Sequence, residues 1–89
     1  MSDSQRLDKW LFFARFVKTR GLGTEWCEKG RVTLNGQQGV KPAHLVRAGD
    51  VLILPKGRDI QAVRVLGLGT RRGPAPHARL LYEILNERT

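Results

Sequence analysis

A basic triplet near the N-terminus, Lys18-Thr19-Arg20, gives the sharpest chemical signal in the sequence. Threonine is a residue type that caps helix N-termini, and the first backbone amides of a helix, together with its dipole, attract anions. The flanking Lys18 and Arg20 add positive charge at the same point. This combination predicts a phosphate-binding site, and the alternative is a solvated basic start of a helix.

The surrounding segment combines cations with aromatic side chains. Residues 6–31 hold seven of the sixteen Lys and Arg residues and three acids; the cations are Arg6, Lys9, Arg15, Lys18, Arg20, Lys29 and Arg31. Aromatic rings beside cations can stack on exposed bases while the charged groups contact phosphates. For Phe12 and Phe13 we favour packing on C-terminal residues such as Leu81 and Tyr82, because exposed rings lower solubility. Phe16 fits either role.

Residues typical of catalysis or metal binding do not cluster in the sequence. His44 and His77 stand alone, and Cys27 has no partner at a metal-ligand spacing. Neither copy of "GLG" extends to a phosphate-binding glycine motif. We therefore expect no enzymatic activity, no cofactor and no metal. Cys27 lies in an apolar, helix-like stretch and is expected to be a buried thiol in a reducing compartment, in preference to a redox sensor.

Composition narrows the class of partner. The chain has 89 residues, 40% of them hydrophobic, which suits one small domain. Its formal charge of +8 and its pI of about 10.9 point to a polyanion, most often a nucleic acid and sometimes an anionic membrane surface. Arg15 interrupts the apolar run "LFFARFV" well short of the ~20 residues that a membrane span needs. We expect a cytoplasmic protein, by default a monomer.

Two helices are predicted to position the basic segment. The first has a core-facing stripe at helical spacing, with Asp3 or Ser4 as its N-cap; the stripe is Leu7, Trp10, Leu11, Ala14 and Val17. The second is capped by Thr19 and ends at Gly30, and its apolar stripe is Leu22, Trp26 and Cys27. Because Gly21 and Gly23 lower helix propensity, this helix must be held by packing and is expected to be loose.

Short β-strands are predicted after Gly30. Asn35-Gly36 favours a type I′ hairpin between residues 31–34 and a returning arm at 40–42, with a bulge at Gly39. Further strands are expected at 51–54 and 60–65. A glycine- and arginine-rich loop follows, "GLGTRRGPAP", for which we keep two readings, a second RNA contact or a mobile connector. The segment "HARLLYEIL", with Leu80, Leu81, Ile84 and Leu85 at helical spacing, predicts a short C-terminal helix.

The order of these pieces resembles a known family. Residues 6–54 combine an "RLDKWL" opening, "KTR", a helix ending in "GRV", the "NG" turn, "KP" and "GDV". This combination resembles the RNA-binding domain first named for the fourth small-subunit ribosomal protein, also called the alpha-L motif. Beyond it, "RRGPAPHARLLYE" is similar to the stand-alone bacterial subfamily of the fifteen-kilodalton heat-shock protein. The basic C-terminal extension of that subfamily has no counterpart here, so its contacts are not expected.

The resemblance implies an α+β fold, with two packed N-terminal helices against a small antiparallel β-sheet and a short C-terminal helix. Residues 1–66 would form the RNA-binding domain, and residues 67–89 would pack on it. Asp8 would orient a neighbouring arginine. The implied RNA-binding residues are Arg6, Lys9, Arg15, Phe16, Lys18, Thr19, Arg20, Lys29, Arg31, Asn35 and Lys41.

The implied function is non-catalytic binding of structured ribosomal RNA on the large subunit. The subfamily is linked to recycling or quality control of stalled complexes that carry a nascent chain on tRNA. Two alternatives stay open. One is an RNA-binding accessory subunit of a separate RNA-modifying or tRNA-charging enzyme. The other is a general polyanion or membrane-surface binder that uses the basic aromatic helix.

Overall fold

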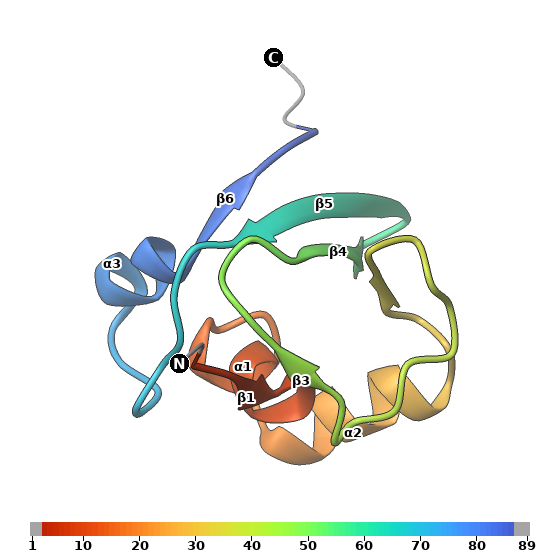
Figure 1. Ribbon diagram of the computed structural model, residues 1–89, viewed down its shortest axis with the longest axis horizontal. Coiled ribbons are helices and arrows are strands. Elements are labelled where there is room, and N and C mark those ends of the chain that lie inside the picture. Colours follow the sequence, from red (N-terminus) through yellow and green to blue (C-terminus); the bar gives the residue numbers. More distant parts are fainter. Residues whose placement is uncertain (1–2, 87–89) are drawn as a thin grey trace.

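The computed structural model describes residues 3–86 as a small α+β fold in which helices α1 and α2 lie on one side of the main sheet (Figure 1). The elements follow in the order β1 (Gln5–Arg6), α1 (Leu7–Phe13), α2 (Arg20–Glu28), β2 (Thr33–Leu34), β3 (Leu45–Val46), β4 (Val51–Lys56), β5 (Asp59–Val65), α3 (Ala75–Ala78), a 3₁₀ turn η1 (Arg79–Leu81) and β6 (Tyr82–Ile84). An antiparallel sheet has the strand order β2-β4-β5-β6, and β1 pairs separately with β3. The expected fold class is confirmed.

Helix α1 begins and ends differently from the prediction. Its N-cap is Arg6 and not Asp3 or Ser4, because backbone carbonyls of the segment before β3 take the first amides: the Leu7 amide donates to the His44 carbonyl at 2.8 Å. The helix stops at Phe13, and Arg15 has a φ of 65°. The predicted stripe is nevertheless buried along its whole length, since Val17 turns inward beyond the helix with 4% of its surface exposed.

Helix α2 has the predicted ends. The Thr19 side-chain oxygen accepts a hydrogen bond from the Leu22 amide at 3.1 Å, as an N-cap does. Gly30 follows the C-cap with a φ of 70°, the left-handed conformation that ends many helices. Cys27 is buried and Trp26 partly buried, whereas Leu22 is exposed and lies outside the core.

Gly23 allows α2, a helix of weak propensity, to be held by close packing against α1. A Cβ atom at this position would lie 2.9 Å from the backbone oxygen of Asp8 in α1. The absent side chain therefore lets α2 approach the α1 backbone closely. The expectation that packing against the first helix, and not propensity, holds this helix is confirmed at Gly23.

Replacing Gly23 with alanine is expected to destabilise the protein. Alanine gains up to about 1 kcal/mol of helix propensity, but the clash with the Asp8 backbone costs about 1–3 kcal/mol as the helices move apart. Urea unfolding followed by circular dichroism measures the net loss. Gly21→Ala is the matched control, because the nearest atom to its Cβ would be the Thr19 Oγ1 at 3.8 Å. If Gly23→Ala is as stable as this control, the close approach does not constrain the fold.

The Asn35-Gly36 turn forms, but its expected returning arm does not. Asn35 and Gly36 have φ values of 50° and 84°, as the predicted turn requires. Only an isolated bridge joins Leu34 to Gln37, and β2 pairs instead with β4. The reason lies in the Asn35 side chain, whose Oδ1 accepts from the Val51 amide at 2.8 Å and ties the turn to β4. Gly39 lies in a loop, so the predicted bulge is wrong.

Strands β4 and β5 confirm the predicted β-runs, and a short C-terminal helix is present, but the helix predicted over residues 77–85 ends early. Only Ala75–Ala78 is α-helical, and Tyr82–Ile84 forms β6 against β5, with Tyr82 opposite Val65. The edge of β5 that does not pair with β4 gives these residues backbone partners, whereas a short helix leaves its terminal backbone groups without partners.

Candidate nucleic-acid interface

The basic triplet lies exposed at the start of α2. The Thr19 side-chain oxygen accepts from the Leu22 amide, and the Thr19 carbonyl accepts from the Gly23 amide. The amides of Arg20 and Gly21 therefore have no hydrogen bond to Thr19. Within residues 3–86, Lys18 and Arg20 form no ion pair. Two unpaired cations therefore flank the N-terminus of a nine-residue helix, where backbone dipoles also favour an anion.

Asp8 holds Arg6 in a defined orientation. The Asp8 side chain is buried and accepts from Arg6 Nε at 3.1 Å, Arg6 Nη2 at 2.9 Å, the Lys9 amide at 2.8 Å and Thr24 Oγ1 at 3.2 Å. Burial by itself raises the pKa of Asp8, but the hydrogen bonds, led by that of Arg6, lower this pKa overall. The carboxylate is thus ionised and presents a fixed, half-exposed guanidinium, as the resemblance implied for Asp8.

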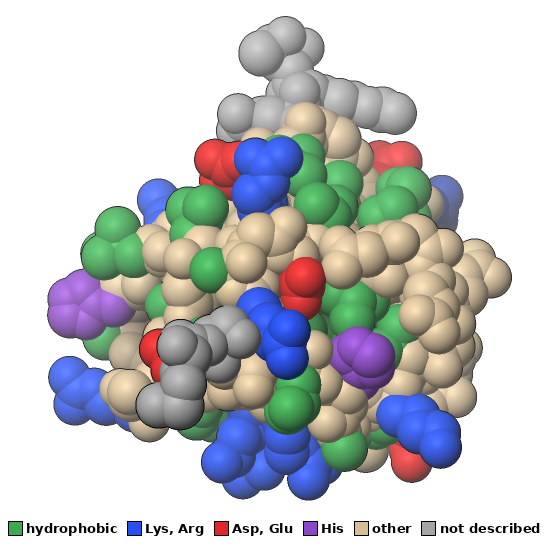
Figure 2. All heavy atoms as spheres, in the orientation of Figure 1, with side chains coloured by type: hydrophobic (Ala, Val, Ile, Leu, Met, Phe, Trp, Pro, Cys, Tyr) green, Lys and Arg blue, Asp and Glu red, His purple; other side chains and the backbone are tan. Residues whose placement is uncertain are grey.

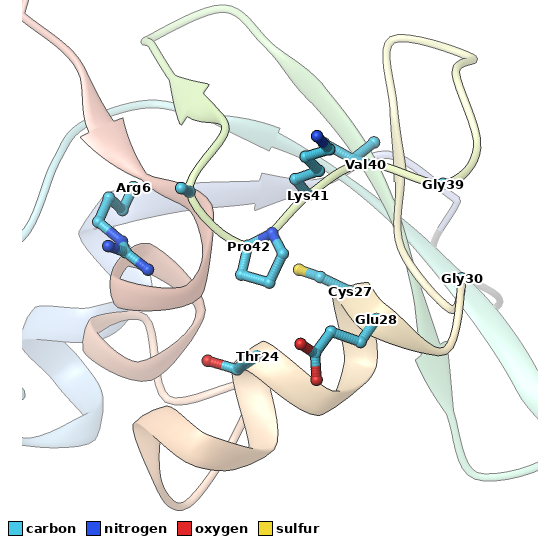
Figure 3. A pocket seen from close by; sticks show the side chains of 10 residues that line it. Arg6, Thr24, Cys27, Glu28, Gly30, Gly39, Val40, Lys41 and Pro42 are labelled. Atoms are coloured by element: carbon cyan, nitrogen blue, oxygen red, sulfur yellow. The ribbon is translucent and has the colours of Figure 1, made fainter.

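A concave site beside α2 brings Arg6 and Lys41 to its lining. It is a cavity of about 640 Å³ between α2 and the segment around Pro42. Figure 3 shows Arg6 at one end of this cavity, with the Cys27 sulfur facing the Pro42 ring near its middle. Glu28 also lines the cavity, so its wall is not uniformly basic. Such a shape suits an RNA backbone passing along the Arg6 end, away from the acid.

Cys27 does not have the properties of a redox sensor. Only 3% of its surface is exposed. Burial, and then the negative charges of Asp8 and Glu28, raise the pKa of this thiol to about 11. A thiol with so high a pKa is protonated at neutral pH and a poor nucleophile. Cys27 is therefore part of the core, as the sequence predicted.

Phe16 has a packing role that differs from the role expected of an RNA-stacking ring. Its ring centroid lies 5.7 Å from that of Trp10 and 4.6 Å from that of Tyr82. The ring is partly buried against the core. The rings of Phe12 and Phe13 also contact the C-terminal half of the chain, as predicted for these two residues. The guanidinium carbon of Arg72 lies 5.3 Å from the centroid of the Phe12 ring.

Three further predicted residues lie at three different places. Arg15 is exposed, and its Nη1 donates to the Gly73 carbonyl at 3.2 Å. Lys29 is the C-cap of α2, at the opposite end of the helix from the triplet, and its ammonium pairs with Glu25 at 2.7 Å. The Asn35 amide is engaged by Asp50 and Val51, so this residue shapes the turn.

The charge distribution agrees with a basic face along the helices. Figure 2 shows Lys and Arg side chains gathered along the lower edge of the molecule, over the region that α1 and α2 occupy in Figure 1. Lys9 is half-buried on α1, and Arg31 is exposed just after Gly30. Sequence reasoning left undecided one further pair of cations, Arg71 and Arg72, whose only signal was their place in a glycine-rich loop.

Comparison with known proteins identifies the fold. Residues 5–52, more than half of the chain, match the family model of the S4 domain. The chain belongs to the S4 domain family. No helix in the described part of this S4 protein is long and apolar enough to cross a membrane. Nor do residues 3–86 group three or more His, Cys, Asp or Glu side chains that could hold a metal ion.

Several curated relatives are similar over most of the chain. A heat shock protein 15 homolog of Aeromonas salmonicida is 49% identical over 78 residues, which are 88% of this chain and 58% of that protein. Heat shock protein 15 of Escherichia coli K12 is 47% identical over the same shares. The chain thus spans somewhat over half the length of these relatives. An RQC P-site tRNA stabilizing factor of Halalkalibacterium halodurans is 35% identical over 92% of this chain and 91% of that protein.

A solved structure has the same fold. The heat shock protein 15 of Vibrio cholerae, described as a trimeric structure, superposes with a TM-score of 0.88 at 38% identity. The match covers 93% of this chain and 83% of that one. It therefore extends beyond the S4 match at residues 5–52 and includes most of the C-terminal segment.

Proposed function

We propose that this S4 protein binds structured ribosomal RNA on the large ribosomal subunit without catalysis. The observation that carries the proposal is the pair of cations at the N-terminus of α2, Lys18 and Arg20, which form no ion pair within residues 3–86. A further cation, Arg6 at the N-cap of α1, is fixed by the buried Asp8. Such groups contact phosphates and read RNA shape more than base sequence. Affinity is then expected to fall steeply with salt concentration.

We further propose that this binding serves the recycling or quality control of stalled complexes that carry a nascent chain on tRNA. Support comes from the similarity to a protein named RQC P-site tRNA stabilizing factor over nearly the full length of both chains. The proposed RNA-facing residues are Arg6, Lys9, Arg15, Lys18, Thr19, Arg20, Lys29, Arg31 and Lys41; Asn35 shapes the turn and Phe16 packs on the core. A cytoplasmic monomer stays a prediction, and the Vibrio cholerae relative is described as trimeric.

Gradient sedimentation of a lysate with tagged protein tests the proposal. At moderate salt, we expect the protein to migrate with free large subunits more than with intact ribosomes, and to leave those fractions after RNase treatment. Migration at the top of the gradient in both samples would contradict ribosome binding. It would also favour the accessory-subunit alternative, which predicts co-purification of one stoichiometric enzyme. Equal binding to anionic vesicles and to RNA would favour the general polyanion binder.

A further inference from the structure

The glycine- and arginine-rich loop between β5 and α3 is fixed in place at both ends. The Trp10 indole Nε1 donates to the Gly67 carbonyl at 2.9 Å. Gln5 forms two hydrogen bonds with Gly69, donating to its carbonyl at 2.6 Å and accepting from its amide at 3.2 Å. At the other end, Arg15 donates to the Gly73 carbonyl. Of the two readings of this loop, these anchors argue against a mobile connector.

Gly69 shows that the loop packs closely on α1. A Cβ atom at this position would lie 2.6 Å from the Phe13 Cβ, so the loop backbone rests directly on the Phe13 side chain. Arg72 is held over the Phe12 ring. Between these contacts Thr70 and Arg71 stay exposed. Thr70 and Arg71 are therefore held in place by the contacts on either side of them. This lowers the conformational entropy that the loop loses when a ligand binds.

A cavity of about 280 Å³ lies between this loop and α3. Its apolar wall consists of Phe13, Leu68, Ala78 and Leu81. Three side chains supply polar groups, namely Thr70, Arg71 and His77. Among residues 3–86, no acidic residue lines it, in contrast to the cavity beside α2, whose lining includes Glu28. The volume lies just below the ~300–1,000 Å³ of typical small-ligand sites, so it suits a single planar group and not a larger ligand.

We propose that this cavity, formed by the 67–73 loop, Phe13 and His77, holds one unpaired nucleobase of the bound RNA, with its phosphate at Arg71. A lining that combines apolar side chains with several polar groups matches a base, which has an apolar face and hydrogen-bonding edges. Arg71 supplies the charge for the attached phosphate. The inference rests on the proposed RNA binding and adds a second contact, outside the S4 match at residues 5–52.

Nuclear magnetic resonance titration of the full chain tests the site directly. The probe is adenosine 5′-monophosphate, compared with ribose 5-phosphate, which lacks the base. We expect the monophosphate to shift the backbone amides of Gly69, Thr70 and Gly73, and ribose 5-phosphate to shift them far less at the same concentration. Equal shifts with both ligands would mean a phosphate site only. No shift with either ligand at several millimolar would overturn the cavity as a nucleotide site.

Two double variants separate this proposal from the proposed function. Arg71→Ala with His77→Ala is expected to weaken monophosphate binding roughly 5-fold or more, the lower end of what one base contact contributes. Arg79→Ala with His44→Ala removes the same residue types elsewhere and is expected to bind as wild type does. The Lys18→Glu, Arg20→Glu protein should retain the monophosphate shifts while it loses ribosome binding. If both activities persist in that protein, the triplet is not the RNA site; if the Arg71 and His77 variant keeps full affinity, the cavity is not the base site.

Discussion

Replacing Lys18 and Arg20 together with glutamate is expected to weaken binding to large ribosomal subunits by roughly 100-fold while the protein stays folded. Both side chains are exposed and form no ion pair within residues 3–86, so their loss removes phosphate contacts and no internal bond. Glutamates at the N-terminus of α2 also occupy the place where its dipole would attract a phosphate. Circular dichroism checks the fold, and binding is measured as a function of KCl concentration.

The salt dependence gives a second measure of the same change. Each lost phosphate contact lowers the slope of log affinity against log salt by about 1, so the double variant should lose about 2 from its slope. The control is Lys56→Glu with Arg58→Glu at the turn between β4 and β5, which changes the net charge by the same amount. If both double variants lose affinity equally, net charge explains the effect and the α2 site does not exist.

Replacing Asp8 with alanine is expected to lower the free energy of unfolding by about 3 kcal/mol. The substitution removes the acceptor of four hydrogen bonds, two of them from Arg6, and leaves the Thr24 hydroxyl and the Lys9 amide without this partner. Urea unfolding measures the loss. Asp59→Ala is the control, since this exposed acid at the start of β5 makes no side-chain hydrogen bond or ion pair in the described chain. Equal stability of the two variants would contradict a structural role for Asp8.

The contribution of Asp8 to stability is also expected to depend on pH. Because the folded-state pKa of Asp8 is lowered, its contribution is fully present above the unfolded pKa of about 3.9 and is lost as the pH falls through the folded value. The stability difference between wild type and Asp8→Ala should therefore be constant from about pH 5 to pH 8 and shrink below about pH 4. A difference that stays constant down to pH 2 would show that the ionised carboxylate is not the stabilising group.

Local features of the fold followed from the sequence alone. The Thr19 cap, the left-handed Gly30 and the Asn35-Gly36 turn depend on hydrogen bonds and backbone angles within a few residues, so residue type predicts them. Strand β5 had clear alternation of apolar and polar residues, and β4 was predicted from a short apolar run that follows a turn. The positive charge of the candidate site could also be predicted from the sequence, because exposed Lys and Arg side chains are positively charged wherever they lie in the fold.

Tertiary structure decided which distant segments meet. Residues 40–42 come soon after the Asn35-Gly36 turn in the sequence, yet β4 is the partner of β2, and the last residues of the predicted C-terminal helix complete the sheet as β6. The hydrophobic period of a strand does not say which strand it pairs with, because several strand edges could form the same backbone hydrogen bonds. The pairing with the lowest free energy is set by side-chain packing across the whole core. The close approaches at Gly23 and Gly69, the position of Phe16 between Trp10 and Tyr82, and the cavity beside Arg71 all depend on that packing. Sequence determined the charges and the local turns of this S4 protein, and the long-range contacts determined which of its side chains share a site.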